Sequence, residues 1–284
     1  MNVRGETWRR AAYAGVRFGP RRFVEYSPAA FGVAWALALP ELRARVRENL
    51  RRFHGRRPFL AEEADVFRTF VAYAHCFTES LGGERPEAAS AVPVVDGREH
   101  LDHAIRAGKG VVLVTAHTGA WDVAARFLSR DYSADVLVVM AAEDDAGARA
   151  VSDGVRVRSG IRVAHVGRTA FDALPLLGHL RRGGVVAVQL DRAHPESAVE
   201  AELCGGPFLV PRGPFHLAML GGAPIVPVFT RRLGYFRYQV TVRPEIRVPR
   251  NGGPEGVVSA ARTATRELEE FVRRDPTQWF HFSG

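Results

Sequence analysis

Short apolar runs that alternate with helical patterns constrain the fold of this 284-residue chain more than any other feature. Runs rich in Val and Ile recur between residues 111 and 229, and they are apolar at successive positions. Strands that are apolar on both faces are typical of a mostly parallel sheet covered by helices. The alternation predicts an α/β fold, with a central, mostly parallel or mixed sheet flanked by helices. The predicted strands are 111–114, 136–139, 161–166, 185–188 and 225–229, and the predicted helices between them are 121–128, 169–180 and 215–220.

Helical periodicity dominates the N-terminal region. Leu42, Val46 and Leu50 lie four residues apart and predict a helix over 41–54, and residues 64–81 repeat the period. We therefore expect an N-terminal basic helical segment, residues 1–90, packed on an α/β core, residues 91–284, in one structural domain. Within that core, residues 235–242 alternate apolar and polar side chains like a strand near a sheet edge, and residues 257–273 form the last predicted helix.

The positive charge of the chain is concentrated near its start. Residues 1–60 contain thirteen arginines and four glutamates, a net charge of +9, whereas the whole chain carries +8. Such a patch suits an anionic partner, either a nucleic-acid backbone or an acidic membrane surface. The alternative is a composition biased toward arginine without any partner, because Lys109 is the only lysine.

The sequence also bears on compartment and membrane contact. Two cysteines allow no disulfide scaffold, and no run reaches the roughly 20 apolar residues of a bilayer-spanning helix. No signal-peptide pattern opens the chain, which predicts a protein that stays inside the cell. The apolar stretch 29–39, which contains Trp35 and Leu37 between cationic flanks, is either an interfacial membrane anchor or an amphipathic core helix.

The strongest candidate for chemistry is His117. It follows the apolar run 111–114, and a turn containing Gly119 separates it from a helix that begins near Asp122. Ligands of open α/β sheets bind at the carboxyl ends of the strands. If the turn folds back, Asp122 can accept a hydrogen bond from one imidazole nitrogen and leave the other to take a proton. This pair suits attack by a substrate hydroxyl on an activated acyl group; the alternative is a strand-end histidine bonded only to backbone.

The segment His117-Thr-Gly-Ala-Trp-Asp122 resembles the H-x4-D/E block of the lysophospholipid acyltransferase superfamily. The resemblance is closest to the branch of lipid A late acyltransferases and phosphatidylinositol mannoside acyltransferases, whose block reads H-x-G-x-W-[DE]. Further blocks of this branch follow in order over residues 40 to 282. They are RVRENL at 45–50, AGKG at 107–110, DR at 191–192, VEAELCG at 199–205, VPRGP at 210–214, GAPIVP at 222–227 and DPTQW at 275–279.

The resemblance implies transfer of a fatty acyl chain from an acyl thioester, acyl-CoA or acyl carrier protein, to a hydroxyl of a lipid or glycolipid. It implies His117 as general base, Asp122 as its partner, and Glu200, or its neighbour Glu202, as an assisting carboxylate. The implied chemistry requires no metal or redox cofactor. The substrate-binding residues that it implies are Arg168, Asp191, Arg192, Arg212 and Gly213, since guanidinium groups bind phosphate and sugar oxygens.

These features predict a peripheral enzyme on the cytoplasmic face of the inner or plasma membrane, bound to an anionic lipid surface and not to nucleic acid. Two departures from the family pattern bear on the acceptor and the anchor: Leu203-Cys204 replaces an aromatic pair, and the apolar N-terminal stretch is short. Two alternatives are a basic nucleic-acid-binding protein and a catalytically idle lipid-binding relative. His100 and His103 share a helix face, but no further metal ligand accompanies them.

Overall fold

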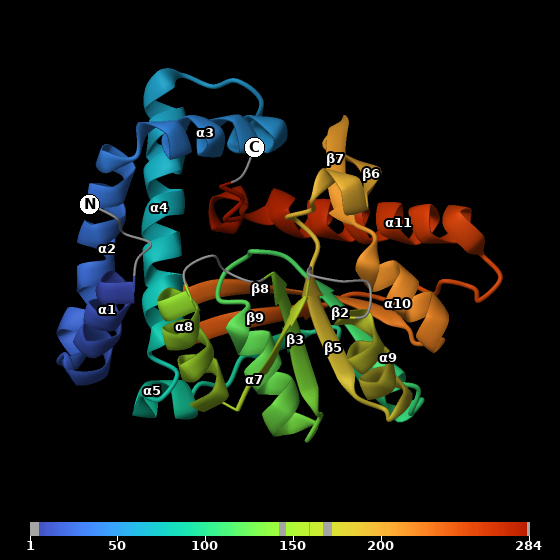
Figure 1. The fold of residues 1–284 in the computed structure, drawn as a ribbon. Coiled ribbons are helices and arrows are strands. Elements are labelled where there is room, and N and C mark those ends of the chain that lie inside the picture. Colours follow the sequence, from blue (N-terminus) through green and yellow to red (C-terminus); the bar gives the residue numbers. More distant parts are fainter. Residues whose placement is uncertain (1–5, 142–145, 159, 167–171, 283–284) are drawn as a thin grey trace.

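The computed structural model describes residues 6–141, 146–158, 160–166 and 172–282 (Figure 1). Its centre is a seven-stranded sheet in the order β1-β9-β8-β2-β5-β3-β4, in which every neighbouring pair is parallel except β8 and β9. Helices flank this sheet, so the predicted α/β class with a mostly parallel, mixed sheet is confirmed. The segment 235–242 contributes β9, which is second from one edge.

The elements have the following bounds. The strands are β1 (Val94–Asp96), β2 (Val111–Thr115), β3 (Val136–Ala141), β4 (Arg162–Val166), β5 (Val185–Gln189), β6 (Ala198–Leu203), β7 (Gly206–Pro211), β8 (Ile225–Gly234) and β9 (Arg237–Val242). The helices are α1 (Glu6–Phe18), α2 (Arg21–Ala38), α3 (Pro40–His54), α4 (Phe59–Leu81), α5 (Pro86–Ala89), α6 (Arg98–Arg106), α7 (Asp122–Asp131), α8 (Ala146–Arg158), α9 (Ala173–Arg181), α10 (Gly213–Gly221) and α11 (Gly253–Arg274), with short 3-10 turns at Pro195–Ser197 and Pro276–Gln278.

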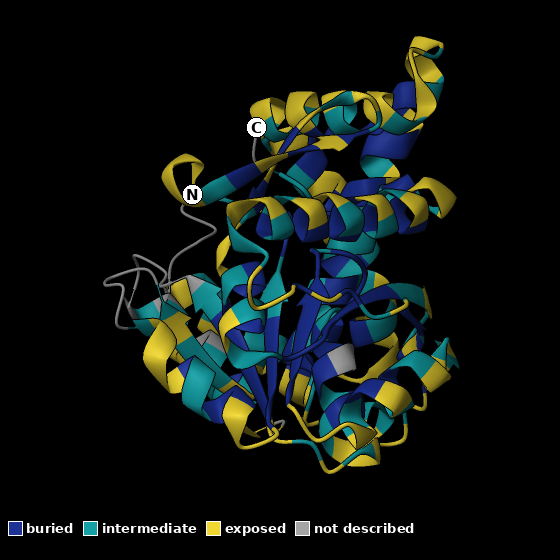
Figure 2. Ribbon diagram, turned by 90° about the vertical axis from the view of Figure 1, so that its right-hand side faces the viewer, coloured by how far each residue is buried: buried dark blue, intermediate teal, exposed yellow. Residues whose placement is uncertain are grey.

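The central strand β2 shows why the sheet is covered on both faces. All five of its residues are buried, and successive side chains point to opposite faces. Val112 and Val114 belong to the core formed with α9, α10 and α11, whereas Val111 and Leu113 belong to the core formed with α6 and α7. Figure 2 shows these strands as the buried centre of the molecule. The unbroken apolar run therefore serves two layers of helices.

The N-terminal helices form a layer beside this core, with α2 alongside α4 (Figure 1). One face of α2 carries a buried stripe of Val24, Pro28, Gly32 and Ala36, which is mostly small and lets the two helices approach closely. The opposite face exposes a second apolar stripe: Phe23, Tyr26, Val33 and Leu37. The apolar stretch 29–39 thus both packs on the core and presents an apolar face to solvent. Within the described ranges, no helix is long and apolar enough to span a bilayer.

We expect Gly32→Ala to destabilise the protein by about 1–3 kcal/mol, because a Cβ at Gly32 would lie 2.6 Å from Val71 Cα and 2.8 Å from Phe70 O on α4. Gly15 of α1 is the matched control, since a Cβ there meets nothing within 4 Å. Gly15→Ala is expected to stabilise by about 0.5–1 kcal/mol through helix propensity alone. Urea unfolding measures both values, and equal stabilisation by the two substitutions would contradict the close helix contact.

The arginines of α3 are largely engaged by α4. Arg43 and Arg47 bind the Glu63 carboxylate, and Arg51 binds Glu62 with Nη2 2.6 Å from Oε2. The hydrogen bonds from the Arg51 side chain and the Arg57 backbone N–H lower the pKa of Glu62 to about 2. The positive charge of residues 1–60 is therefore balanced in part by acidic residues just beyond that range, which the sequence count assigns to the rest of the chain.

Candidate active site

His117 lies two residues past the carboxyl end of β2. The chain turns there through Gly119, whose φ of +48° falls in the left-handed region that favours glycine. A Cβ at this position would lie 2.5 Å from the carbonyl oxygen of Thr230 on β8, so the turn is closely packed as well. The helix α7 then begins at Asp122. The predicted order of strand, glycine turn and helix is confirmed.

The His117 imidazole pairs with Asp191. Its Nδ1 lies 2.8 Å from Asp191 Oδ1, and its backbone N–H donates to Asp191 Oδ2 at 3.0 Å. Asp191 follows β5, which is the direct neighbour of β2 in the sheet. The carboxyl ends of parallel neighbours lie side by side, and this proximity brings the two residues together across 74 positions of sequence.

Asp191 is buried, and the protein itself engages both of its oxygens. The second oxygen also accepts a hydrogen bond from Trp279 Nε1 at 2.9 Å. Burial alone would raise the pKa of Asp191, but attraction to His117 and the hydrogen bond from its ring prevail and place the pKa well below the usual range. The Asp191 side chain is thus enclosed by the protein and bonded to His117 and Trp279, and its contact with substrate stays a prediction.

This geometry favours one tautomer of the neutral His117 ring. An ionised carboxylate only accepts hydrogen bonds, so in the neutral ring Nδ1 carries the hydrogen and Nε2 holds the lone pair. Within the described part of the chain, Nε2 has no hydrogen-bond partner, and the His117 side chain is 19% exposed. The ring is thus held by one nitrogen and has the other available as a proton acceptor.

Asp122 occupies a different position from the one predicted. Its Oδ2 accepts a hydrogen bond from Ser80 of α4, and its Oδ1 lies 3.7 Å from Arg156 Nε of α8. The prediction that Asp122 holds the His117 imidazole is wrong, because Asp191 occupies Nδ1. Sequence proximity suggests Asp122 as the partner of His117, whereas the sheet brings Asp191 to the imidazole from the end of the adjacent strand β5. Asp122 instead joins the first turn of α7 to α4 and lies near α8.

The C-terminal segment braces the turn that carries His117. Phe280 N–H donates to the His117 carbonyl at 2.7 Å, and Gly119 N–H donates to the Gln278 carbonyl at 3.0 Å. The Gln278 side chain is bound in turn to Arg232 backbone groups of β8. The block DPTQW at 275–279 therefore supplies both a backbone clamp and the indole donor to Asp191.

Asn49 extends this bracing to the N-terminal helices. Its Nδ2 donates to the His281 carbonyl at 2.7 Å, so the block at 45–50 holds the C-terminal segment from α3. His281 stacks on Trp279 with ring centroids 4.8 Å apart. Burial lowers the pKa of His281 to about 4 despite the nearby Asp191 carboxylate, and this ring is neutral at pH 7.

The remaining predicted residues are not brought to His117 by any hydrogen bond or ion pair in the described ranges. Glu200 and Glu202 lie on the exposed face of β6, whose other face packs on α11. Arg192 donates to the Phe280 carbonyl at 3.0 Å, and Arg212 donates to the Ala198 carbonyl at 2.9 Å. Gly213 is exposed at the start of α10, and Arg168 lies outside the described residues.

Several contributors to the site escape prediction from the sequence. Trp279 stands out in the sequence only as the last residue of the block DPTQW, yet its indole N–H donates a hydrogen bond to the buried carboxylate. Ser80 carries no signal beyond its helix position. The signal for Asp191 is present, because it directly follows a predicted strand. Among the described residues, no group of three His, Cys, Asp or Glu side chains could hold a metal ion, His100 and His103 included.

Fold and site together define an α/β protein with a histidine at the carboxyl end of a central strand, oriented by a buried carboxylate. A model of the bacterial lipid A biosynthesis acyltransferase family matches residues 8–283. The chain belongs to this family, as the resemblance of its motifs predicts.

Similar proteins of known name point to the same branch. The phosphatidylinositol mannoside acyltransferase of Mycobacterium tuberculosis (strain CDC 1551 / Oshkosh) is 28% identical over 189 residues, which cover 64% of this chain and 59% of that protein. The phosphatidylinositol mannoside acyltransferase of Mycolicibacterium smegmatis is 25% identical over 197 residues, 64% of this chain and 61% of that protein. The match spans about three fifths of the length of these relatives.

Proposed function

We propose that this protein is an O-acyltransferase that moves a fatty acyl chain from an acyl thioester to a hydroxyl of a lipid or glycolipid. The observation that carries the proposal is the His117–Asp191 pair at the carboxyl end of β2, with Nδ1 engaged and Nε2 available. Family membership and the phosphatidylinositol mannoside acyltransferase relatives support the same class of reaction.

The proposed reaction uses His117 Nε2 as general base. Nε2 takes the proton of the acceptor hydroxyl while the hydroxyl oxygen attacks the thioester carbonyl carbon. As the carbon–sulfur bond breaks, Nε2 returns the proton to the leaving thiolate. Asp191 stabilises the imidazolium between these two steps, because its negative charge is held 2.8 Å from Nδ1. The reaction consumes one thioester, releases one thiol and proceeds without a metal or redox cofactor.

Other predicted residues have supporting parts in this proposal. Asp122 acts as a positioning residue that fixes the start of α7 behind the His117 turn, through Ser80. Arg212 and Gly213 directly follow β7 and are proposed to contact the acceptor, as are Arg192 and Arg168. Glu200 or Glu202 would assist from the exposed face of β6. Acyl-CoA and acyl carrier protein are both proposed donors.

A thiol-release assay tests the function. Palmitoyl-CoA or palmitoyl carrier protein is incubated with the protein and an extract of lipids that offers hydroxyl acceptors, and free thiol is followed with time. The proposal expects acceptor-dependent thiol release and an acceptor whose mass rises by one palmitoyl group. Release that is independent of any acceptor would identify a thioester hydrolase, and no release with either donor would contradict the proposal.

We also propose that the protein acts as a peripheral protein on the cytoplasmic face of the inner or plasma membrane. The support is the exposed apolar stripe on α2, formed by Phe23, Tyr26, Val33 and Leu37, with the exposed Arg22 next to Phe23 in the chain. Aromatic and aliphatic side chains next to cations suit the interface of an anionic bilayer. Nucleic acid is not a proposed partner, because three arginines of α3 are already in ion pairs with α4.

The double substitution Val33→Asp/Leu37→Asp is expected to reduce binding to vesicles of phosphatidylglycerol and phosphatidylcholine by at least about tenfold, since it places two charges at the apolar interface. Both side chains are exposed, so the fold should be retained, and circular dichroism checks this. The matched control is Val92→Asp/Val157→Asp, which also replaces exposed valines. Vesicle flotation measures binding, and equal losses for both variants would contradict the proposed surface.

A further inference from the structure

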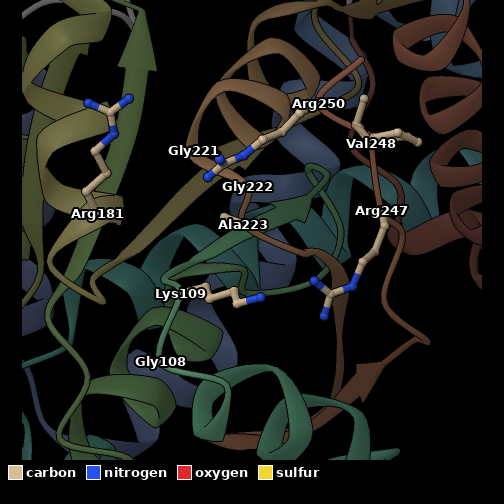
Figure 3. Close-up of a pocket in the computed structure, with 10 residues that line it drawn as sticks. Gly108, Lys109, Arg181, Gly221, Gly222, Ala223, Arg247, Val248 and Arg250 are labelled. Atoms are coloured by element: carbon tan, nitrogen blue, oxygen red, sulfur yellow. The ribbon is translucent and has the colours of Figure 1, made fainter. Parts of the chain in front are cut away.

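A cavity of about 710 Å³ opens beside the sheet at a place that the acyl-transfer site does not use. Its lining includes four cationic side chains, Lys109, Arg181, Arg247 and Arg250, and no carboxylate (Figure 3). Lys109 and Arg247 point their charged ends toward one another, and Arg250 extends across Gly222, whereas Arg181 points away from the other three. Apolar walls come from Ala223, Val248 and Pro249.

The cavity lies at the amino ends of the parallel strands β2 and β8, whereas His117 lies at the carboxyl end of β2. Its lining residues 108–109 lie one residue before the start of β2, and residues 221–223 lie one residue before the start of β8. These parallel strands start at the same edge, whereas His117 follows the other end of β2. The five residues of β2 separate the two places by roughly 17 Å at about 3.3 Å per residue. A ligand in the cavity therefore cannot share the reacting atoms at His117.

The charges in the cavity are not balanced by the protein. Within the described ranges, Arg247 has an ion pair with Glu245, while Lys109, Arg181 and Arg250 have no carboxylate within ion-pair distance. The carboxyl ends of α9 and α10 also lie here, and each contributes about half a negative charge at most. The four side-chain charges exceed the sum of these contributions. The charged ends of Lys109 and Arg247 converge and repel one another, and a bound anion would relieve that repulsion.

The backbone leaves room for Arg250 in particular. Gly222 ends α10 with φ +66°, and a Cβ there would lie 2.9 Å from Arg250 Nη2 and 3.1 Å from its Nε. The left-handed backbone favours glycine at this position, and the guanidinium group lies against it. The Arg250 side chain is thus seated in the cavity wall, although it has no carboxylate partner there.

We propose that this cavity is a second binding site, which takes a soluble small molecule carrying two or more phosphate charges. Guanidinium and ammonium groups together are the side chains that recognise phosphate oxygens. The volume is that of a small-molecule pocket and is much larger than one phosphate ion requires. The site is independent of acyl transfer, so its occupancy is measured by binding and not by turnover.

Isothermal titration calorimetry with inorganic pyrophosphate tests the site. In buffer of about 0.15 M ionic strength, the wild-type protein is expected to show saturable binding with a stoichiometry near one. Lys109→Gln/Arg250→Gln is expected to weaken this binding by roughly tenfold or more, because it removes two phosphate-binding charges. Circular dichroism and thermal unfolding without ligand verify that the variant is folded.

Two controls separate this site from other sources of anion binding. Arg262→Gln removes an exposed charge from α11 and should leave pyrophosphate affinity within about twofold. His117→Ala should bind pyrophosphate like the wild type, since it lies at the other sheet edge. The proposal is overturned by an absence of saturable binding, by wild-type affinity in Lys109→Gln/Arg250→Gln, or by an equal loss in Arg262→Gln or His117→Ala. Equal affinity for phosphatidic acid vesicles and pyrophosphate, lost in the same variant, would overturn the restriction to soluble ligands.

Discussion

Replacement of His117 by alanine is expected to lower kcat for acyl transfer by about 10²–10⁴-fold, the range that a general base contributes. The loss arises because the imidazole that is hydrogen-bonded to the Asp191 carboxylate is removed. His281 also lies near this carboxylate, but within the described ranges no hydrogen bond joins the two side chains. KM for the thioester is expected to change little, since the imidazole acts on the acceptor hydroxyl in the transition state. Steady-state thiol release with palmitoyl-CoA measures both constants.

The control for this variant is His103→Ala, which removes an exposed imidazole from α6. It should retain wild-type kcat. Thermal unfolding should show that His117→Ala remains folded, because the backbone of residue 117, including the hydrogen bonds with Asp191 and Phe280, is unchanged. Full activity in a folded His117→Ala protein would eliminate His117 as the base and with it the proposed mechanism.

The fold of residues 91–284 can largely be predicted from periodicity, and the β2 region shows why. A strand buried on both faces has to be apolar at every position, and Val111 to Val114 satisfies that requirement. The β6–β7 hairpin is different. It forms a separate two-stranded sheet whose outer face carries Glu200 and Glu202, so its strands lack a continuous apolar run. Its tight turn places Cys204 at φ +52° and Gly205 at φ +76°. A cysteine in the sequence does not predict such a left-handed turn.

The site is harder to predict than the fold because its contacts cross between segments. His117 is identifiable from its place after an apolar strand, but its carboxylate partner depends on strand order. Periodicity identifies β2 and β5 as strands without showing that they are neighbours. Sequence reasoning therefore assigns the role of imidazole partner to Asp122, the nearest acidic residue in the sequence, whereas in the folded sheet Asp191 is the partner. The contact of Trp279 is even harder to predict, because its indole reaches Asp191 only after the C-terminal segment folds back over the turn that carries His117.

Asp191→Asn is the substitution that distinguishes these two carboxylates. The amide has no negative charge to stabilise the imidazolium, and its NH₂ group can face Nδ1 and force the hydrogen onto Nε2. We expect kcat to fall by about 10²–10⁴-fold with little change in KM. Nitrogen NMR of the His117 ring reports the tautomer independently of activity.

Asp122→Asn provides the comparison within the same site. Asp122 acts through Ser80 and Arg156, so its loss can reduce turnover by shifting α7, but the Nδ1–H bond to Asp191 should persist. The His117 ring in Asp122→Asn should therefore keep the wild-type tautomer, whatever its rate. Asp96→Asn, at the exposed end of β1, should alter neither signal. The opposite result would be a changed tautomer in Asp122→Asn and a wild-type tautomer in Asp191→Asn. It would make Asp122 the imidazole partner, because the charge that determines which ring nitrogen carries the hydrogen would then lie on α7 and not after β5.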